Sequence, residues 1–191
     1  AGSTREVEIS VGLTIGTGIG SAFIRDRRPV VSGPGVPPLG EVHRLGRGGT
    51  PLEDFVSSRA LQRRYREATR YGASPQGDTL EVVQIARRAN EGDLVARKVF
   101  ADAYADLAEI VGPHLRDFGT EALVLGGSIA KSVELVRRFL VPPLQAYGPE
   151  GVLPVSVSSD TERSALIGAA QWAEVRRAGD GYGPGAVDPD H

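Results

Sequence analysis

Hydrophobic and polar positions alternate at the start of the chain. In residues 6–15 the apolar side chains occupy every second position, at Val7, Ile9, Val11, Leu13 and Ile15. A period of two is typical of a β-strand with one buried face. Two short apolar runs, residues 22–24 and 29–31, follow on either side of the polar residues 25–28. We therefore expect a three-stranded antiparallel meander.

The middle of the chain has apolar residues at helical spacing. Thr50 and Pro51 have the pattern of an N-cap followed by a first helical residue, which predicts a helix to about residue 70. A Gly/Ser/Pro/Gln loop over residues 71–78 and a second helix at about 79–89 follow, and then a longer helix. Pro113 lies within that last run, so we expect a kink or an early end there.

The last third of the chain returns to short strands and helices. Residues 122–125 are wholly apolar, which indicates a strand buried on both faces. We expect Ser128 to open a helix that ends before Pro142 and Pro143. A strand within 152–157 and a helix over 163–177 complete the order. The order of the elements predicts an α/β fold with a mixed sheet: strands come first, then helices, then strand-helix-strand-helix.

Composition limits the classes of function. The chain has 191 residues, a net charge of −2 and a mass of 20.2 kDa, so nothing attracts it globally to nucleic acid or an anionic membrane. No apolar run reaches the roughly eighteen residues of a membrane span, and no secretory signal precedes the first strand, so the expected location is cytoplasmic. The absence of cysteine excludes disulfides, thiolate nucleophiles and cysteine zinc sites.

Three glycines lie within five residues at Gly16-Thr17-Gly18-Ile19-Gly20. The spacing does not fit the dinucleotide pattern G-x-G-x-x-G, and no Gly-Lys-Ser/Thr follows to make a Walker loop. Two interpretations remain. The turn either offers its N–H groups and the Thr17 hydroxyl to an anion, or is a plain tight hairpin.

A second glycine pair, Gly126-Gly127, lies between a strand and an expected helix. The carboxyl end of a strand in an open α/β sheet is a common ligand site, although close packing of strand and helix also calls for glycine. Residues 32–49 are rich in glycine and proline, which indicates either a functional loop or a mobile one.

The ordered set of motifs resembles the ROK family of sugar kinases and sugar-responsive repressors. Its matching segments are 13–20, 40–43, 52–53, 89–96, 124–127 and 166–170, within a resemblance that covers about residues 7–175. The resemblance implies an actin-like ATPase (ribonuclease H-like) fold with two lobes. This chain resembles the C-terminal lobe only, at residues 1–178, and residues 179–191 are expected to form a disordered tail.

The resemblance also implies roles for particular residues. Gly16, Thr17 and Gly18 would contact phosphate, and Gly126 and Gly127 would contact the nucleotide. The candidate sugar ligands are Glu41, His43 and Glu53. Glu53 matches the family's pattern well, whereas Glu41 and His43 are two residues apart where the family spaces them three apart.

Two family features are missing from the sequence. The cysteine-rich zinc loop of many members is replaced by residues 44–50, so no structural zinc is expected. The Asp-x-Gly-x-Thr motif and the catalytic Asp of an Asn-Asp pair would precede Gly16, but residues 1–15 contain no aspartate. We therefore assign no catalytic residue and no metal ligand in this chain, and expect the N-terminal lobe to be absent from it.

Three hypotheses follow. The first is the lobe of a kinase that phosphorylates a hexose, glucose or an N-acetylated amino sugar, with ATP and Mg²⁺ or with polyphosphate, and that is inactive as this fragment. The alternative is the sugar-sensing domain of a ROK repressor, which would contact nucleic acid only through a helix-turn-helix upstream. The third is a decayed lobe without a ligand. A homodimer is also expected, because the resemblance implies dimerisation through this lobe and because a first strand without a partner would leave an exposed edge.

Overall fold

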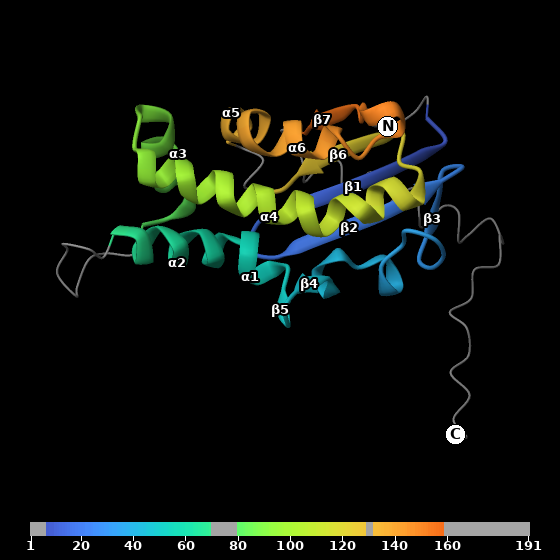
Figure 1. Cartoon of the computed structure of the whole chain (residues 1–191), viewed down its shortest axis with the longest axis horizontal. Helices are drawn as coiled ribbons and strands as arrows, with labels where there is room; N and C mark the ends of the chain where they lie inside the picture. The colour runs from blue at the N-terminus through green and yellow to red at the C-terminus, as the bar shows by residue number, and fades with distance from the viewer. Residues whose placement is uncertain (1–6, 70–79, 129–131, 159–191) are drawn as a thin grey trace, which may run out of the picture.

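The structure is a computed structural model that describes residues 7–69, 80–128 and 132–158 (Figure 1). Five strands form a mixed sheet in the order β3-β2-β1-β6-β7. The strands are β1 Ile9–Ile15, β2 Ile19–Arg25, β3 Arg28–Val30, β6 Ala122–Gly126 and β7 Val155–Val157. The first three pair antiparallel, and β6 runs parallel to both β1 and β7. The predicted meander and mixed sheet are confirmed.

The helices begin after the meander and end before β7. Their bounds are α1 Glu53–Val56, α2 Ser58–Thr69, α3 Val82–Glu91, α4 Leu94–Phe118, α5 Val133–Leu135, the π-helical turn η4 Val136–Leu140 and α6 Val141–Gln145. Three short 3-10 turns are η1 Pro38–Gly40, η2 Val42–Arg44 and η5 Pro149–Gly151. A small ladder joins β4 Gly46–Arg47 to β5 Thr50–Pro51.

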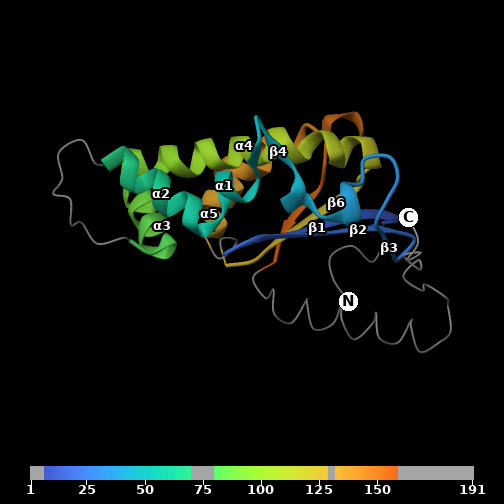
Figure 2. The ribbon, with the colours of Figure 1, turned by 90° about the horizontal axis from the view of Figure 1, so that it is seen from below.

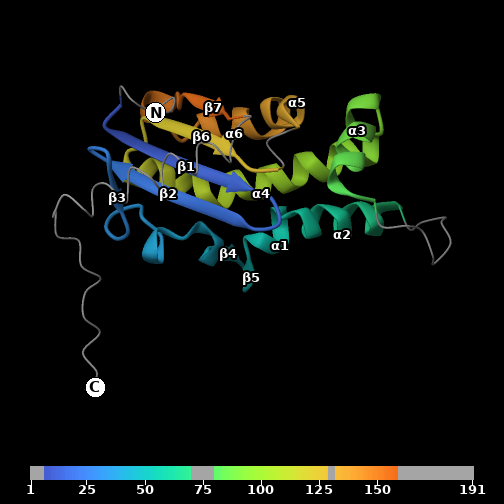
Figure 3. The same cartoon turned by 180° about the vertical axis from the view of Figure 1, so that it is seen from behind.

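Helix α4 lies across one face of the sheet, as the view from below shows (Figure 2). The odd-numbered residues of β1 from Val11 to Ile15 are buried on this face, as their period-2 pattern predicts. Phe23 of β2 meets Phe118 of α4 edge to face, with ring centroids 5.1 Å apart. The opposite face carries small residues such as Gly12 and Ala22, and none of the described helices covers it (Figure 3).

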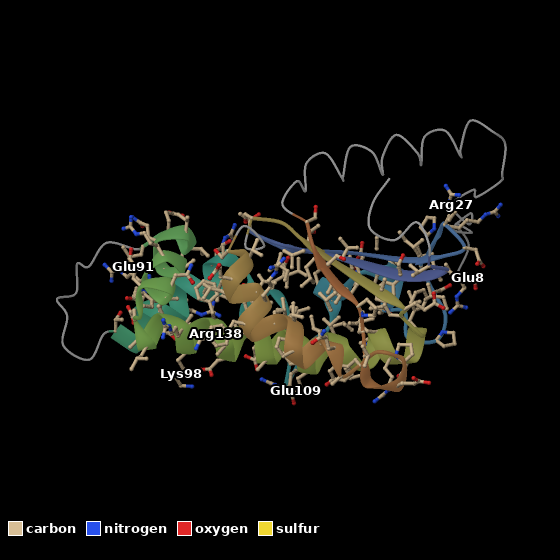
Figure 4. The ribbon with its side chains drawn as sticks, turned by 90° about the horizontal axis from the view of Figure 1, so that it is seen from above. Glu8, Arg27, Glu91, Lys98, Glu109 and Arg138 are labelled. Atoms are coloured by element: carbon tan, nitrogen blue, oxygen red, sulfur yellow. The ribbon has the colours of Figure 1, made fainter. Side chains whose placement is uncertain are left out.

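Helices α2 and α3 extend away from the sheet along the first part of α4 (Figure 1). Gly92 ends α3 in a left-handed conformation at φ 111°, and the Asp93 side chain caps α4 by accepting from the Ala96 N–H. The Tyr65 hydroxyl of α2 donates to Asp93 at 2.7 Å. The 89–96 motif therefore builds a structural corner. Figure 4 shows Glu91 of this corner at the opposite end of the molecule from Arg27.

The predicted helix start at Thr50 is wrong. Thr50 and Pro51 form β5, because Gly48 and Gly49, both with positive φ, turn the chain back so that Arg47 pairs with Thr50. The helical part begins at Glu53 and is broken at Ser57, which has extended φ/ψ. Residues 32–49 are also less irregular than expected, since they contain η1, η2 and β4.

One alternative expected at Pro113, an early helix end, is wrong, and so are two further proline and serine predictions. Helix α4 does not end at Pro113 but continues to Phe118. Ser128 lies in a turn, and the helix that follows begins at Val133. Pro142 and Pro143 do not interrupt it. They are the second and third residues of α6, which continues directly from the π-helical turn, so the helix accommodates two residues that have no N–H to donate.

Strand β1 is the middle strand of the sheet, paired on both sides. The expectation of an exposed first strand is therefore wrong, and that argument for a homodimer does not hold. Within the described ranges, no helix is long and apolar enough to cross a membrane. The expected loop at 71–78, the helix at 163–177 and the tail at 179–191 lie outside the described residues.

Candidate functional site

The two glycine segments predicted to bind phosphate and nucleotide lie side by side. Strands β1 and β6 are parallel, with Thr14 opposite Gly126, so their carboxyl ends meet at one edge. Gly127 has φ +96°, and a Cβ atom there would overlap the backbone of Ile15. A Cβ at Gly16 would lie 2.9 Å from the Ser128 hydroxyl. The arrangement fits the rule that α/β sheets bind ligands at this edge.

The glycine hairpin is a three-residue loop between β1 and β2, over residues 16–18. The Gly16 N–H donates to the Gly18 carbonyl at 2.9 Å, so it is not available to a ligand. Among the described residues, the N–H groups of Thr17 and Gly18 form no hydrogen bond, and Thr17 is exposed. Two N–H donors and a hydroxyl at one tip are suited to bind an anion.

Small residues in this hairpin also make room for neighbouring side chains. A Cβ at Gly18 would lie 2.7 Å from Glu53 Oε1, and one at Gly20 would lie 2.6 Å from Thr14 Oγ1. Gly20 itself lies in β2 rather than in the turn. The glycine spacing alone is therefore no proof of a phosphate site, because these glycines also make room for the side chains of Glu53 and Thr14.

Glu53 joins the predicted sugar site to the hairpin. It is the first residue of α1, and its Oε1 accepts a hydrogen bond from the Ile19 N–H at 3.0 Å. Five residues later, the Ser58 N–H and hydroxyl donate to the Gly16 carbonyl at 2.8 and 3.0 Å. One candidate sugar ligand is thus in contact with the candidate phosphate loop.

Ser21 attaches the segment that carries Glu41 and His43 to the same strand. Its hydroxyl donates to the Gly40 carbonyl at 2.6 Å and accepts from the Val42 N–H at 3.0 Å. Ile19 and Ser21 are two residues apart in β2, about 7 Å along the strand on one face. All three candidate sugar residues are therefore supported by β2. Among the described residues, no hydrogen bond joins Glu41 or His43 to Glu53.

The Glu41 carboxylate has two neighbours within its own segment, the side chains of Arg44 and His43. Its Oε2 accepts from Arg44 Nε and lies 3.6 Å from His43 Nε2. The hydrogen bond from Arg44 lowers the pKa of the Glu41 carboxyl, with smaller contributions from the charges of Arg44 and His43. Both side chains are about 40% exposed, at 38% for Glu41 and 41% for His43. The carboxylate is therefore ionised and reachable from solvent.

The sequence pattern did not indicate the residues that hold this segment. Ser21 and Ser58 carry no recognisable motif. Asp106 of α4 accepts from both Arg47 and Arg64, and Phe55 lies beneath both guanidinium groups at 5.2 and 5.9 Å. These residues are too far apart in the chain for any local signal.

Among the described residues, no three His, Cys, Asp or Glu side chains gather into a metal site.

Comparison with known proteins supports the family assignment. A sequence model described as the ROK family matches residues 1–176. No curated protein sequence matches the chain.

Solved structures with the same fold include two kinases and a regulator. A ROK family glucokinase from Streptomyces griseus, in complex with glucose and AMPPNP, is 19% identical with a TM-score of 0.73, over 90% of this chain and 62% of that one. A ROK hexokinase from Thermus thermophilus is 23% identical with a TM-score of 0.69, over 91% and 62%. A ROK family transcriptional regulator, a homologue of the E. coli MLC protein, is 19% identical with a TM-score of 0.71, over 87% and 46%. These likenesses confirm the expected actin-like α/β fold. The chain spans about three fifths of the kinases it resembles.

Proposed function

The chain belongs to the ROK family, and we propose that it is the C-terminal lobe of a sugar kinase that transfers the γ-phosphoryl group of ATP to a hexose. The contact between Glu53 and the hairpin carries this proposal, because Glu53 Oε1 lies 3.0 Å from the Ile19 nitrogen. A sugar at Glu53 and a phosphate at the hairpin tip would lie next to each other. Phosphoryl transfer depends on holding donor and acceptor in this way.

The hairpin edge has the groups that a nucleotide phosphate needs. The N–H groups of Thr17 and Gly18 and the Thr17 hydroxyl are the proposed phosphate contacts, and Gly126 and Gly127, at the adjacent carboxyl end of β6, are the proposed contacts for the rest of the nucleotide. ATP with Mg²⁺ would supply the phosphoryl group and neutralise its charge, and polyphosphate is a second candidate donor. Glucose bound with AMPPNP in the Streptomyces griseus glucokinase supports this pairing of ligands.

The proposed sugar contacts are Glu41, His43 and Glu53, placed along β2 by Ser21 and Ile19. Carboxylates accept hydrogen bonds from sugar hydroxyls, and charged acceptors form stronger bonds than neutral ones. The proposed substrate is glucose or an N-acetylated amino sugar.

The group that would remove the hydroxyl proton is the missing part of the mechanism. Residues 1–15 contain no aspartate, and we assign the base to a lobe outside this sequence. The test is a coupled assay of the 191-residue chain with ATP and glucose, N-acetylglucosamine or N-acetylmannosamine. We expect no turnover by the chain alone and turnover by the complete reading frame that contains it. Turnover by the chain alone would contradict the assignment of the base.

A sugar-sensing repressor domain is the second candidate. One observation favours it: Glu41 is already bonded to Arg44. The ROK transcriptional regulator shares the fold with a TM-score of 0.71, a likeness that does not separate it from the glucokinase at 0.73. Reading the sequence that precedes Ala1 separates the two candidates. An Asn-Asp pair and an Asp-x-Gly-x-Thr motif support the kinase, whereas a winged helix supports the repressor.

A further inference from the structure

The segment from Glu53 to Ser58 holds the hairpin at both of its ends. Ile19, at the start of β2, donates to Glu53 Oε1 at 3.0 Å. Gly16, at the end of β1, accepts from the Ser58 N–H and hydroxyl at 2.8 and 3.0 Å. The two N–H groups of the tip lie between these anchors. The segment therefore determines where those donors point.

The segment that holds the hairpin is itself fixed by the core. Leu52 and Val56, on either side of Glu53, are fully buried. The Leu52 N–H donates to the Leu45 carbonyl at 2.8 Å, and Ser57 accepts from the Ala60 N–H at the start of α2. The backbone of Glu53 thus has little freedom to move away from the hairpin.

In the part of the chain that the structure describes, one of the two carboxylate oxygens of Glu53 accepts a hydrogen bond. Within the described ranges, Oε2 accepts no hydrogen bond, and the side chain is partly exposed. Gly18 has no side chain, which lets the carboxylate approach the hairpin, since a Cβ there would lie 2.7 Å from Oε1. An ionised carboxylate has capacity for further donors, so Oε2 is open to a hydroxyl.

We propose that Glu53 is a positioning residue that couples sugar binding to the conformation of the phosphate hairpin. A sugar hydroxyl on Oε2 fixes the carboxylate, and the fixed carboxylate holds the Ile19 N–H on Oε1 more of the time. By linkage, a phosphate that orders the hairpin increases sugar affinity to the same degree. The coupling to sugar rests on the proposed function, because it needs a sugar at Glu53. The hydrogen bond by which Glu53 holds Ile19 does not depend on that function.

The experiment measures amide hydrogen exchange of Ile19 by NMR in the 191-residue chain, with and without glucose. The variants are Glu53→Ala, which removes the acceptor, and Glu53→Gln, which keeps an acceptor oxygen. Asp54→Ala is the matched control, because Asp54 is the next residue of α1 and its side chain is exposed. We expect Glu53→Ala to speed Ile19 exchange about tenfold or more, because it removes one charge-assisted hydrogen bond. We expect Glu53→Gln and Asp54→Ala to change the exchange rate little. Glucose should slow exchange in the wild type and not in Glu53→Ala.

The outcomes separate the coupling from the proposed function. Unchanged Ile19 exchange in Glu53→Ala would overturn the positioning role. Glucose that shifts the amides near Glu41 and His43 but leaves Ile19 exchange unchanged would overturn the coupling and leave the sugar site standing. If glucose shifts no amide at all, the proposed sugar site and the coupling both fail, and the variants still decide whether Glu53 holds the hairpin.

Discussion

Gly127 packs against the backbone of Ile15, and this contact joins the two glycine segments of the site. Ile15 is the last residue of β1, directly before the hairpin, and Gly127 follows the end of β6. At φ +96° with no room for a Cβ atom, position 127 accepts only glycine without rearrangement. The edge where a nucleotide is proposed to bind is therefore built by direct backbone packing between strands far apart in the sequence.

Replacing Gly127 tests how much this packing matters. We expect Gly127→Ala to lower the free energy of unfolding by more than the about 1–3 kcal/mol of left-handed strain, because the methyl group also overlaps the backbone of Ile15. Gly92→Ala is the matched control, since Gly92 has φ +111° and open space at its Cβ position. Urea unfolding of both variants measures the difference. Equal losses would show that the contact with Ile15 is unimportant.

Ser21 is expected to keep the Glu41 segment on β2. Ser21→Ala removes both the donor to Gly40 and the acceptor for Val42, so we expect a loss of about 1–2 kcal/mol in unfolding free energy. Glucose affinity should fall with it, while Ser21→Thr, which keeps the hydroxyl, should restore both. Denaturant midpoints and glucose titrations measure the two effects. A loss in stability with unchanged glucose affinity would show that Ser21 does not support the sugar site.

Asp106 is expected to hold the β4–β5 ladder through Arg47. Arg47 has a second carboxylate partner, Glu109, which is labelled in Figure 4 on the side of α4 away from the sheet. We expect Asp106→Asn to release the ladder and to speed trypsin cleavage after Arg47 several-fold, because the ladder has only two residues per strand. Asp102→Asn is the control, because Asp102 lies one helical turn away and, among the residues that the structure describes, pairs with Lys98 alone.

Equal cleavage rates in the two variants of α4 would contradict this role of Asp106. The difference between them should also shrink at high salt, since the side chain of Arg47 is 45% exposed and its ion pairs are screened.

The pKa of Glu41 provides a pH test. The Arg44 hydrogen bond lowers it below the ordinary value of 4.5, so the folded state binds the proton less well than the unfolded state. The pair therefore stabilises the fold above pH 4.5, and this contribution is lost as pH falls through the folded pKa. Carbon-detected NMR titration should show a higher Glu41 midpoint in Arg44→Ala. An unchanged midpoint would mean that Arg44 does not hold the carboxylate.

The sheet could be predicted from the sequence because its signals are local. Alternation over residues 7–15 and the wholly apolar run 122–125 each define one strand and its buried faces, and both appear as expected in β1 and β6. The helix start at Thr50 failed because the positive φ of Gly48 and Gly49 made a reverse turn that local helix signals do not describe. The reverse turn at Gly48 and Gly49 therefore decided the local structure, and the N-cap preference of Thr50 did not.

The candidate site was predictable only in part, because its supports are contacts between distant positions. The motifs named Glu53 and the hairpin, but nothing local indicates that Glu53 and Ile19, 34 residues apart, share a hydrogen bond. Ser21 and Asp106 gave no signal for the same reason. The structure also shows that Gly18 packs against Glu53 and Gly20 against Thr14, so that close packing accounts for both glycines as well as anion binding does.

The most direct test of the account is an NMR titration of the 191-residue chain with AMPPNP and Mg²⁺, followed at the backbone amides of Thr17 and Gly18. These two N–H groups form no hydrogen bond among the described residues, so a bound phosphate gives them their first acceptor. The account predicts saturable downfield shifts at both amides and a much smaller shift at Ile19, which is already bonded to Glu53. Saturable shifts elsewhere in the chain with none at Thr17 and Gly18, or no shifts at all, would contradict it.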